Sequence, residues 1–248
     1  MNIAVCVCQV PDTASVIGFV DGTRDLSRVN EVMNPYDEYA LEEAVRLKER
    51  FSGSVVTAFS VAPPSAKEML RKALAMGADR AVLVSGTEVS DPYQTALALS
   101  RSLSSYYANT LPDLVFCGKQ STDFQSAQVP LMLAELLGMG AVAGIRSLST
   151  SAEGLRAERE IEGGVESYDL HYPALFSVEK GLNIPRKTTI KSVIEARKKT
   201  IDIFPLSLDA TPFVVMKTIT PLERKKKCQF VLDEKELIRL LGEERNLL

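Results

Sequence analysis

The chain has 248 residues, of which 46% are hydrophobic and 25% are charged, enough for one sizeable domain, alone or with an arm. A formal net charge of −3 lacks the basic excess of nucleic-acid-binding proteins, and no apolar run approaches the ~20 residues of a membrane span. The chain starts directly in a strand-like run without the basic segment of a signal peptide, so we expect a cytoplasmic protein with no direct membrane insertion.

The first two-thirds of the chain alternate between short apolar runs and helical patterns. The apolar runs predict buried parallel strands at Ile3–Val7, Val55–Val61, Ala81–Val84 and Leu114–Cys117. The helical patterns predict helices at Pro35–Arg50, Ser65–Met76, Asp91–Tyr107 and Val129–Leu137. Asn34 and Asp91 are expected as helix caps, and Ser65 with Glu68 has the spacing of a capping box. This alternation predicts an α/β fold with a doubly wound, mostly parallel sheet.

The loop Gly118–Val129 lies between a predicted strand and a predicted helix. A helix start offers unpaired backbone N–H groups and a positive dipole end, which suits an anion such as a nucleotide phosphate. An ordinary strand–helix connection with a polar cap explains the same residues. The glycine-rich fingerprints of dinucleotide-binding folds and of P-loop NTPases are absent from the sequence, which disfavours both classes.

The pattern changes after about Ser147. A hairpin is predicted from Leu155–Ile161 and Ser167–Tyr172, followed by a short strand at Ala174–Val178. A helix at Asp233–Leu241 closes the chain. We expect residues 1–200 to form the α/β domain with its hairpin extension. The apolar residues of 201–248 favour an arm that packs on a partner over a disordered tail.

Six segments form an ordered set from about Ile3 to Lys199. They are Gln9–Thr13, Met33–Asp37 continuing into Ala40–Lys48, Leu70–Arg80, Gly118–Val129, Glu158–Gly164 and Leu182–Arg186. Together they resemble the beta subunit of electron transfer flavoproteins. The resemblance implies an adenine-nucleotide-binding, Rossmann-like fold and a heterodimer with an alpha subunit that carries most of the FAD. Since the flavin performs the chemistry, no catalytic residue and no metal ligand is predicted.

The resemblance also implies site residues. The family's nucleotide contacts fall on Cys6, Asn34, Pro35, Tyr36, Asp37, Val61, Gly118, Lys119, Gln120, Ser121, Thr122, Asp123, Phe124, Gln125, Ser126, Ala127, Gln128 and Val129. Leu182 matches an exposed leucine in a recognition loop, about residues 181–199. That loop inserts into a redox partner, an acyl-CoA-type dehydrogenase or another flavin or iron–sulfur protein. Glu160 matches a glutamate that contacts the alpha subunit.

The bound nucleotide is expected to be AMP with a structural role. The alternative is a second FAD that oxidises NADH in an electron-bifurcating branch, which Val10–Thr13 and Ala127–Val129 resemble. Phe124 stands where that branch has a glycine, so its side chain is expected to narrow the path for a second phosphate. Cys8, in place of that branch's lysine, also favours AMP.

A rival from another class is a stand-alone adenine-nucleotide sensor of the universal-stress type. Such a sensor needs no chain beyond about Val178, and the 70 residues that follow argue against it.

Overall fold

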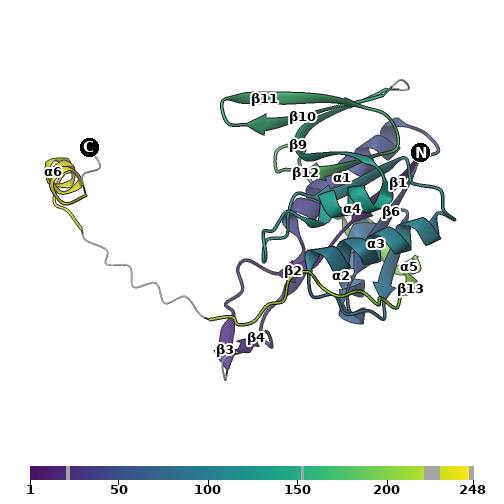
Figure 1. Ribbon diagram of the computed structural model, residues 1–248, viewed down its shortest axis with the longest axis horizontal. Coiled ribbons are helices and arrows are strands. Elements are labelled where there is room, and N and C mark those ends of the chain that lie inside the picture. Colours follow the sequence, from purple (N-terminus) through teal and green to yellow (C-terminus); the bar gives the residue numbers. More distant parts are fainter. Residues whose placement is uncertain (21–22, 152–153, 221–229, 246–248) are drawn as a thin grey trace.

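The structure, a computed structural model, describes residues 1–20, 23–151, 154–220 and 230–245. A nine-stranded sheet forms its centre, with the strand order β11-β10-β9-β12-β8-β1-β6-β7-β13 (Figure 1). The strands are β1 (Asn2–Cys6), β6 (Val55–Val61), β7 (Arg80–Ser85), β8 (Leu114–Gly118), β9 (Gly140–Thr150), β10 (Leu155–Ile161), β11 (Gly164–Leu170), β12 (Ala174–Val178) and β13 (Asp202–Pro205). The pairs of β10 with β9 and β11 are antiparallel, and all the other pairs in this sheet are parallel.

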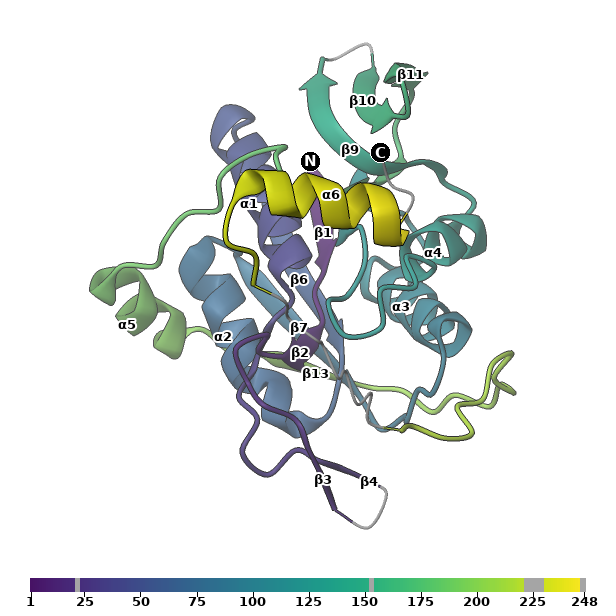
Figure 2. The ribbon, with the colours of Figure 1, turned by 90° about the vertical axis from the view of Figure 1, so that its left-hand side faces the viewer.

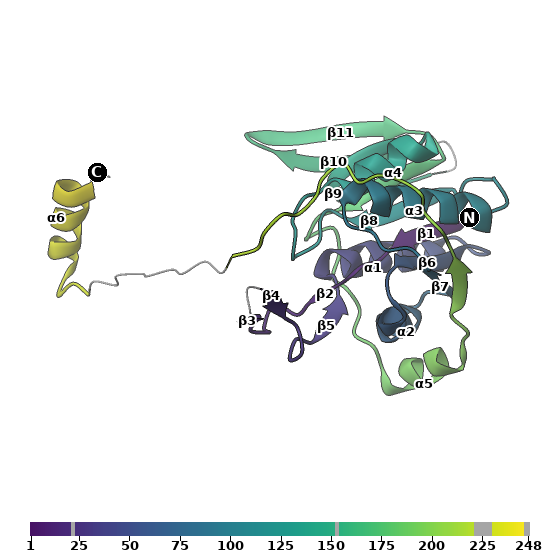
Figure 3. The ribbon, with the colours of Figure 1, turned by 60° about the horizontal axis from the view of Figure 1, so that its bottom comes forward.

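Helices cover both faces of the sheet (Figure 3). On one face lie α1 (Pro35–Arg50), the short 3-10 helix η1 (Pro64–Ala66), α2 (Lys67–Met76) and α5 (Ile190–Lys198). On the other face lie α3 (Pro92–Tyr106) and α4 (Val129–Leu137). Alternate residues of β1 enter the two cores: Ile3 and Val5 pack toward α1, whereas Ala4 and Cys6 pack toward α3 and α4. The doubly wound sheet predicted from the sequence is therefore confirmed.

Two small antiparallel sheets stand outside the main one. They pair β2 (Gln9–Pro11) with β5 (Glu31–Met33), and β3 (Gly18–Val20) with β4 (Thr23–Asp25). The β3–β4 hairpin projects from the body of the molecule in Figures 1 and 2. These four strands and β9 were not predicted. Residues of β9 alternate irregularly between buried and exposed positions, which hides the period of a strand.

Two predicted caps are wrong. The Ser65–Glu68 capping box is absent, because Ser65 lies in η1 and α2 begins only at Lys67, after Ala66. Asn34 precedes α1, but its side chain makes no capping hydrogen bond within the described chain and turns instead to other partners described below. The Asp91 cap is confirmed, since its side chain accepts from the Gln94 N–H at 2.8 Å.

The sheet continues past the predicted domain boundary at residue 200. β13 pairs with β7, and Leu206 N donates to Ser85 O at 2.8 Å. Beyond this edge, the chain leads to α6 (Glu234–Arg245), which stands apart from the sheet in Figure 1. Of the predicted arm, residues 221–229 and 246–248 lie outside the described residues. None of the described helices is long and apolar enough to span a membrane.

Candidate functional site

A cavity lies where the winding of the sheet reverses, between the carboxyl ends of β1 and β8. β6 and β7 follow on one side of β1, and β8 and β12 on the other. Open α/β sheets bind ligands at such a switch point. The lining residues are Cys6, Val7, Cys8, Asn34, Asp37, Val61, Thr95, Leu99, Cys117, Gly118, Gln120, Ser121, Ser126, Ala127, Gln128, Val129 and Pro130.

Three helices start at this cavity. Asn34 directly precedes α1, and Asp37 lies in its first turn. Thr95 and Leu99 belong to α3. Gln128 directly precedes α4, which begins with Val129 and Pro130. Because each helix start carries a partial positive charge, the cavity suits an anion although its described lining contains no lysine or arginine.

The start of α4 is the best anion cradle of the three. Within the described chain no side chain caps this helix, so its first N–H groups remain for another acceptor. Ala127 has a left-handed φ of 54° and Gln128 a right-handed φ of −93°. Successive residues of opposite hand turn their N–H groups into one concavity that binds anions. Gln125 is also left-handed, with φ 53°, and such strain in residues other than glycine accumulates at functional sites.

Asp37 ties the strand ends to the start of α1. Its carboxylate accepts from Cys8 N at 2.7 Å, from Gly118 N at 3.0 Å and from Asn34 Nδ2 at 3.0 Å. Burial raises the pKa of Asp37 to about 6, although these hydrogen bonds favour the charged form. A Cβ at Gly118 would lie 2.2 Å from Asp37 Oδ1, so only glycine allows the strand end and α1 to approach so closely.

Asn34 presents an unused acceptor at the cavity. Its Nδ2 donates to Asp37 and to Gln120 O at 2.9 Å. Its Oδ1 is buried and has no hydrogen-bond partner among the described residues. Since an unsatisfied buried acceptor costs about 1–3 kcal/mol, the arrangement favours a ligand that donates an N–H or O–H there.

Three cysteine thiols also line the cavity. Cys6 and Cys117 sit opposite each other on β1 and β8, and Cys8 follows β1. Burial, with the neighbouring Asp37 carboxylate, raises the pKa of Cys8 well above its ordinary value. A hydrogen bond with Cys6, followed by burial, does the same to the pKa of Cys117. Both thiols therefore stay protonated near neutral pH and serve as soft, weakly polar lining.

The structure brings eleven of the predicted contact residues to the cavity lining. They are Cys6, Asn34, Asp37, Val61, Gly118, Gln120, Ser121, Ser126, Ala127, Gln128 and Val129. It does not bring Pro35, Tyr36, Lys119, Thr122, Asp123, Phe124 or Gln125 to that lining. The cavity is also lined by residues that were not predicted as contacts: Val7, Cys8, Thr95, Leu99, Cys117 and Pro130. Each lies next to another lining residue or one helix turn from one.

Phe124 lies outside the lining of the first cavity, and its side chain is 58% exposed. Its expected effect on the path of a second phosphate stays a prediction. Lys119 also points elsewhere, and its Nζ donates to Glu179 at 2.6 Å.

A second cavity adjoins the first and shares Ala127 with it. Its lining consists of Lys119, Ala127, Leu131, Ala143, Gly144, Arg146, Arg159, Glu160, Ile161, Ser177, Glu179 and Lys180. The second cavity has a volume of about 590 Å³, and the first about 110 Å³. Typical small-molecule pockets measure roughly 300–1,000 Å³, so a nucleotide seated in the first cavity extends beyond it. Glu160, the predicted alpha-subunit contact, lies in the second lining and forms an ion pair with Arg146.

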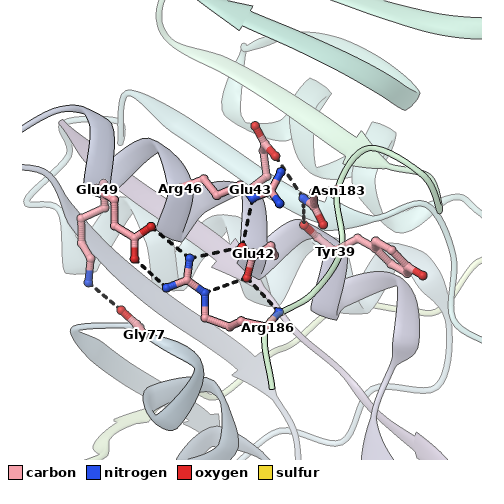
Figure 4. Close-up of polar contacts among 9 residues, drawn as sticks. Tyr39, Glu42, Glu43, Arg46, Glu49, Gly77, Asn183 and Arg186 are labelled. Atoms are coloured by element: carbon pink, nitrogen blue, oxygen red, sulfur yellow. Dashed lines mark hydrogen bonds and ion pairs between the residues drawn. The ribbon is translucent and has the colours of Figure 1, made fainter. Parts of the chain in front are cut away.

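The predicted recognition loop is held against α1 (Figure 4). Asn183 Nδ2 donates to Tyr39 O at 2.9 Å and to Glu43 at 3.0 Å. Arg186 binds the carboxylates of Glu42 and Glu49 through its guanidinium, at 2.6–3.2 Å. Leu182, expected to be exposed, packs in part against the hydrophobic core. The two most exposed apolar residues of this loop are Ile184 and Ile190, at 82% and 83%.

Comparison with known proteins identifies the family of the chain. Residues 23–209 match the electron transfer flavoprotein domain. The electron transfer flavoprotein subunit beta of Thermoanaerobacterium thermosaccharolyticum is 36% identical over 260 aligned residues, covering 99% of this chain and 98% of that protein. Protein FixA of Bradyrhizobium diazoefficiens is 35% identical, covering 93% of this chain and 86% of its own. The electron transfer flavoprotein subunit beta of Megasphaera elsdenii is 34% identical, covering 90% of this chain and 89% of that protein. The chain therefore belongs to the electron transfer flavoprotein family, on the side of subunit beta and FixA.

Proposed function

We propose that this chain is the beta subunit of a cytoplasmic heterodimer and that the first cavity holds AMP in a structural role. Electrons pass through the FAD of the alpha subunit, and this chain positions that subunit and the redox partners. The observation that carries the nucleotide assignment is the cavity at the β1/β8 switch point, with helix starts around it and the free Asn34 Oδ1.

The lining favours a single phosphate. The N–H groups at the start of α4 bind one phosphate group without a cationic side chain. A diphosphate carries more charge, and the described lining of the first cavity offers no lysine or arginine to balance it.

One observation supports a second candidate, in which a second FAD replaces AMP and oxidises NADH. The second cavity begins at Ala127 and supplies Lys119, Arg146 and Lys180. A dinucleotide seated in the first cavity would find room and positive charge there. Lys119 and Arg146 are already paired with Glu179 and Glu160, which reduces the charge available to such a ligand.

Two surfaces outside the nucleotide cavity support the proposed partners. Glu160 and the exposed apolar residues Ile161 and Val165 of the β10–β11 hairpin provide a face for the alpha subunit. An interfacial charge such as Glu160 contributes more to partner choice than to affinity. The loop from Lys180 to Thr189, clamped to α1 by Arg186, is proposed to dock a dehydrogenase. Leu182 supports it from beneath, and Ile184 is displayed.

The test is identification of the nucleotides released when the purified protein is denatured. We expect an unlike second chain to copurify, and denaturation to release one FAD and one AMP per heterodimer. Two FAD per heterodimer together with NADH oxidation would establish the second candidate. A homodimer that releases an adenine nucleotide and no flavin would instead support a stand-alone sensor.

A further inference from the structure

Residues 206–214, here named the strap, follow β13 and lie along the start of α3. Leu206 packs beside the core that lies between the sheet and helices α3 and α4, and Ala210 O accepts from Gln94 Nε2 at 2.7 Å. The ring of Phe213 stacks on Tyr93 with centroids 4.1 Å apart. Tyr93 and Gln94 both belong to the first turn of α3. The strap is therefore held at both its start and its end, although it contains no helix or strand.

One carboxylate joins the strap to α3. Asp91 is 7% exposed, and its two oxygens have different tasks. Oδ1 accepts from Gln94 N at 2.8 Å and caps the helix, whereas Oδ2 accepts from Phe213 N at 2.6 Å and from Val214 N at 3.2 Å. Charge-assisted bonds of this kind are roughly twice as strong as neutral ones. The position of the strap and the capping of α3 consequently depend on the same side chain.

The next turn of α3 belongs to the nucleotide cavity. Thr95 lines that cavity, and its N–H and hydroxyl both donate to Asp91 O, at 3.2 and 3.1 Å. Leu99, one turn further, also lines the cavity. A continuous set of hydrogen bonds thus runs from the strap through Asp91 to a residue at the ligand site.

We infer that Asp91 is a positioning residue that couples docking of the strap to nucleotide binding. A ligand that contacts the start of α3 favours the state in which this helix is capped and the strap is docked. Because coupling between two sites is reciprocal, a docked strap in turn strengthens nucleotide binding. This inference rests on the proposed nucleotide site.

Two substitutions separate the roles of Asp91 from those of the strap. Asp91→Asn keeps an oxygen that caps α3, because asparagine is a good N-cap, but it places an amide against the strap N–H groups. Phe213→Ala loosens the strap and leaves α3 intact. Phe230→Ala is the matched control, since Phe230 is 92% exposed and lies beyond the strap.

The experiment measures hydrogen–deuterium exchange and AMP affinity in the full-length protein. In the wild type, AMP should slow exchange of the strap amides about tenfold, since protection reports the free energy of local opening. Asp91→Asn and Phe213→Ala should each weaken AMP binding at least about fivefold, the lower end of typical coupling energies. Phe230→Ala should leave both measurements unchanged.

Two failures are distinguishable. AMP binding without protection of the strap, or a Phe213→Ala variant with loosened strap and unchanged AMP affinity, would overturn the coupling alone. A wild-type protein that binds no AMP would contradict the proposed site, and the coupling with it.

Discussion

Asp37 is the residue on which the geometry of the site depends most. It joins the end of β1 through Cys8, the end of β8 through Gly118, and the loop before α1 through Asn34. Asp37 is buried, and burial raises the free energy of its charged form. The protein therefore orders these segments around a carboxyl group that ionises unfavourably. The site is therefore built at some cost to the stability of the fold, as is common for ligand sites.

This cost predicts a dependence of stability on pH. The pKa of Asp37 is raised from 3.8 to about 6 in the folded protein, so its contribution to stability is fully present below pH 3.8 and is lost as the pH rises through about 6. In nucleotide-free protein, the free energy of unfolding of the wild type relative to Asp37→Asn should fall by about 2 kcal/mol between about pH 4.5 and 7.5. Urea unfolding of both proteins at the two pH values measures this. A difference that is independent of pH would contradict the buried, protonatable Asp37.

At the scale of elements, α1 connects two functional regions. Its first turn lies at the cavity, and its middle and last turns carry Glu42 and Glu49, which hold Arg186 (Figure 4). Glu42 is only 4% exposed. Burial raises the pKa of Glu42, but the hydrogen bonds from Arg186 outweigh this and leave the pKa below its usual value. The pair thus acts as a structural clamp for the loop.

Removal of the Arg186 guanidinium should destabilise the fold, because it leaves the buried Glu42 carboxylate with fewer hydrogen-bond partners. Arg186→Gln is expected to lower the free energy of unfolding by about 2 kcal/mol. The matched control is Arg239→Gln, which breaks the exposed Arg239–Glu243 pair on α6 and should cost less than about 0.5 kcal/mol. Chemical denaturation compares the two. Equal effects of both substitutions would mean that the clamp contributes no more than a surface ion pair.

The sequence predicted the elements that show a clear apolar run or a regular hydrophobic period. It did not predict elements that are mostly exposed or very short. The run Val55–Val61 is buried along nearly its whole length, so its apolar character identified β6 directly. α5 was missed because only Ala196 of that helix is buried, and β13 because Asp202–Pro205 is short and lies at the sheet edge. The order strand–loop–helix located the loop Gly118–Val129. The outward position of Phe124 depends on how the loop folds, which no local pattern encodes.

At the scale of the whole molecule, the cavity lies where the order of strands reverses direction. The chain adds β6 and β7 on one side of β1, and β8 and β12 on the other side. The site therefore follows from topology: β1 lies in the interior of the sheet, and β6 and β8 flank it in parallel. Helices from both faces begin at the strand ends, and each helix start brings a partial positive charge to the cavity. The partner surfaces that we propose are the hairpin, the clamped loop and the C-terminal segment.

A larger side chain in the cavity shows whether the nucleotide binds there. Val61, at the carboxyl end of β6, lines the cavity, whereas Val55 lies at the other end of the same strand and does not. Val61→Phe should weaken AMP binding at least about tenfold, because overpacking by ~1.4 kcal/mol already lowers affinity tenfold. Val55→Phe should retain the wild-type affinity. A folded Val61→Phe protein with unchanged AMP affinity would contradict the assignment.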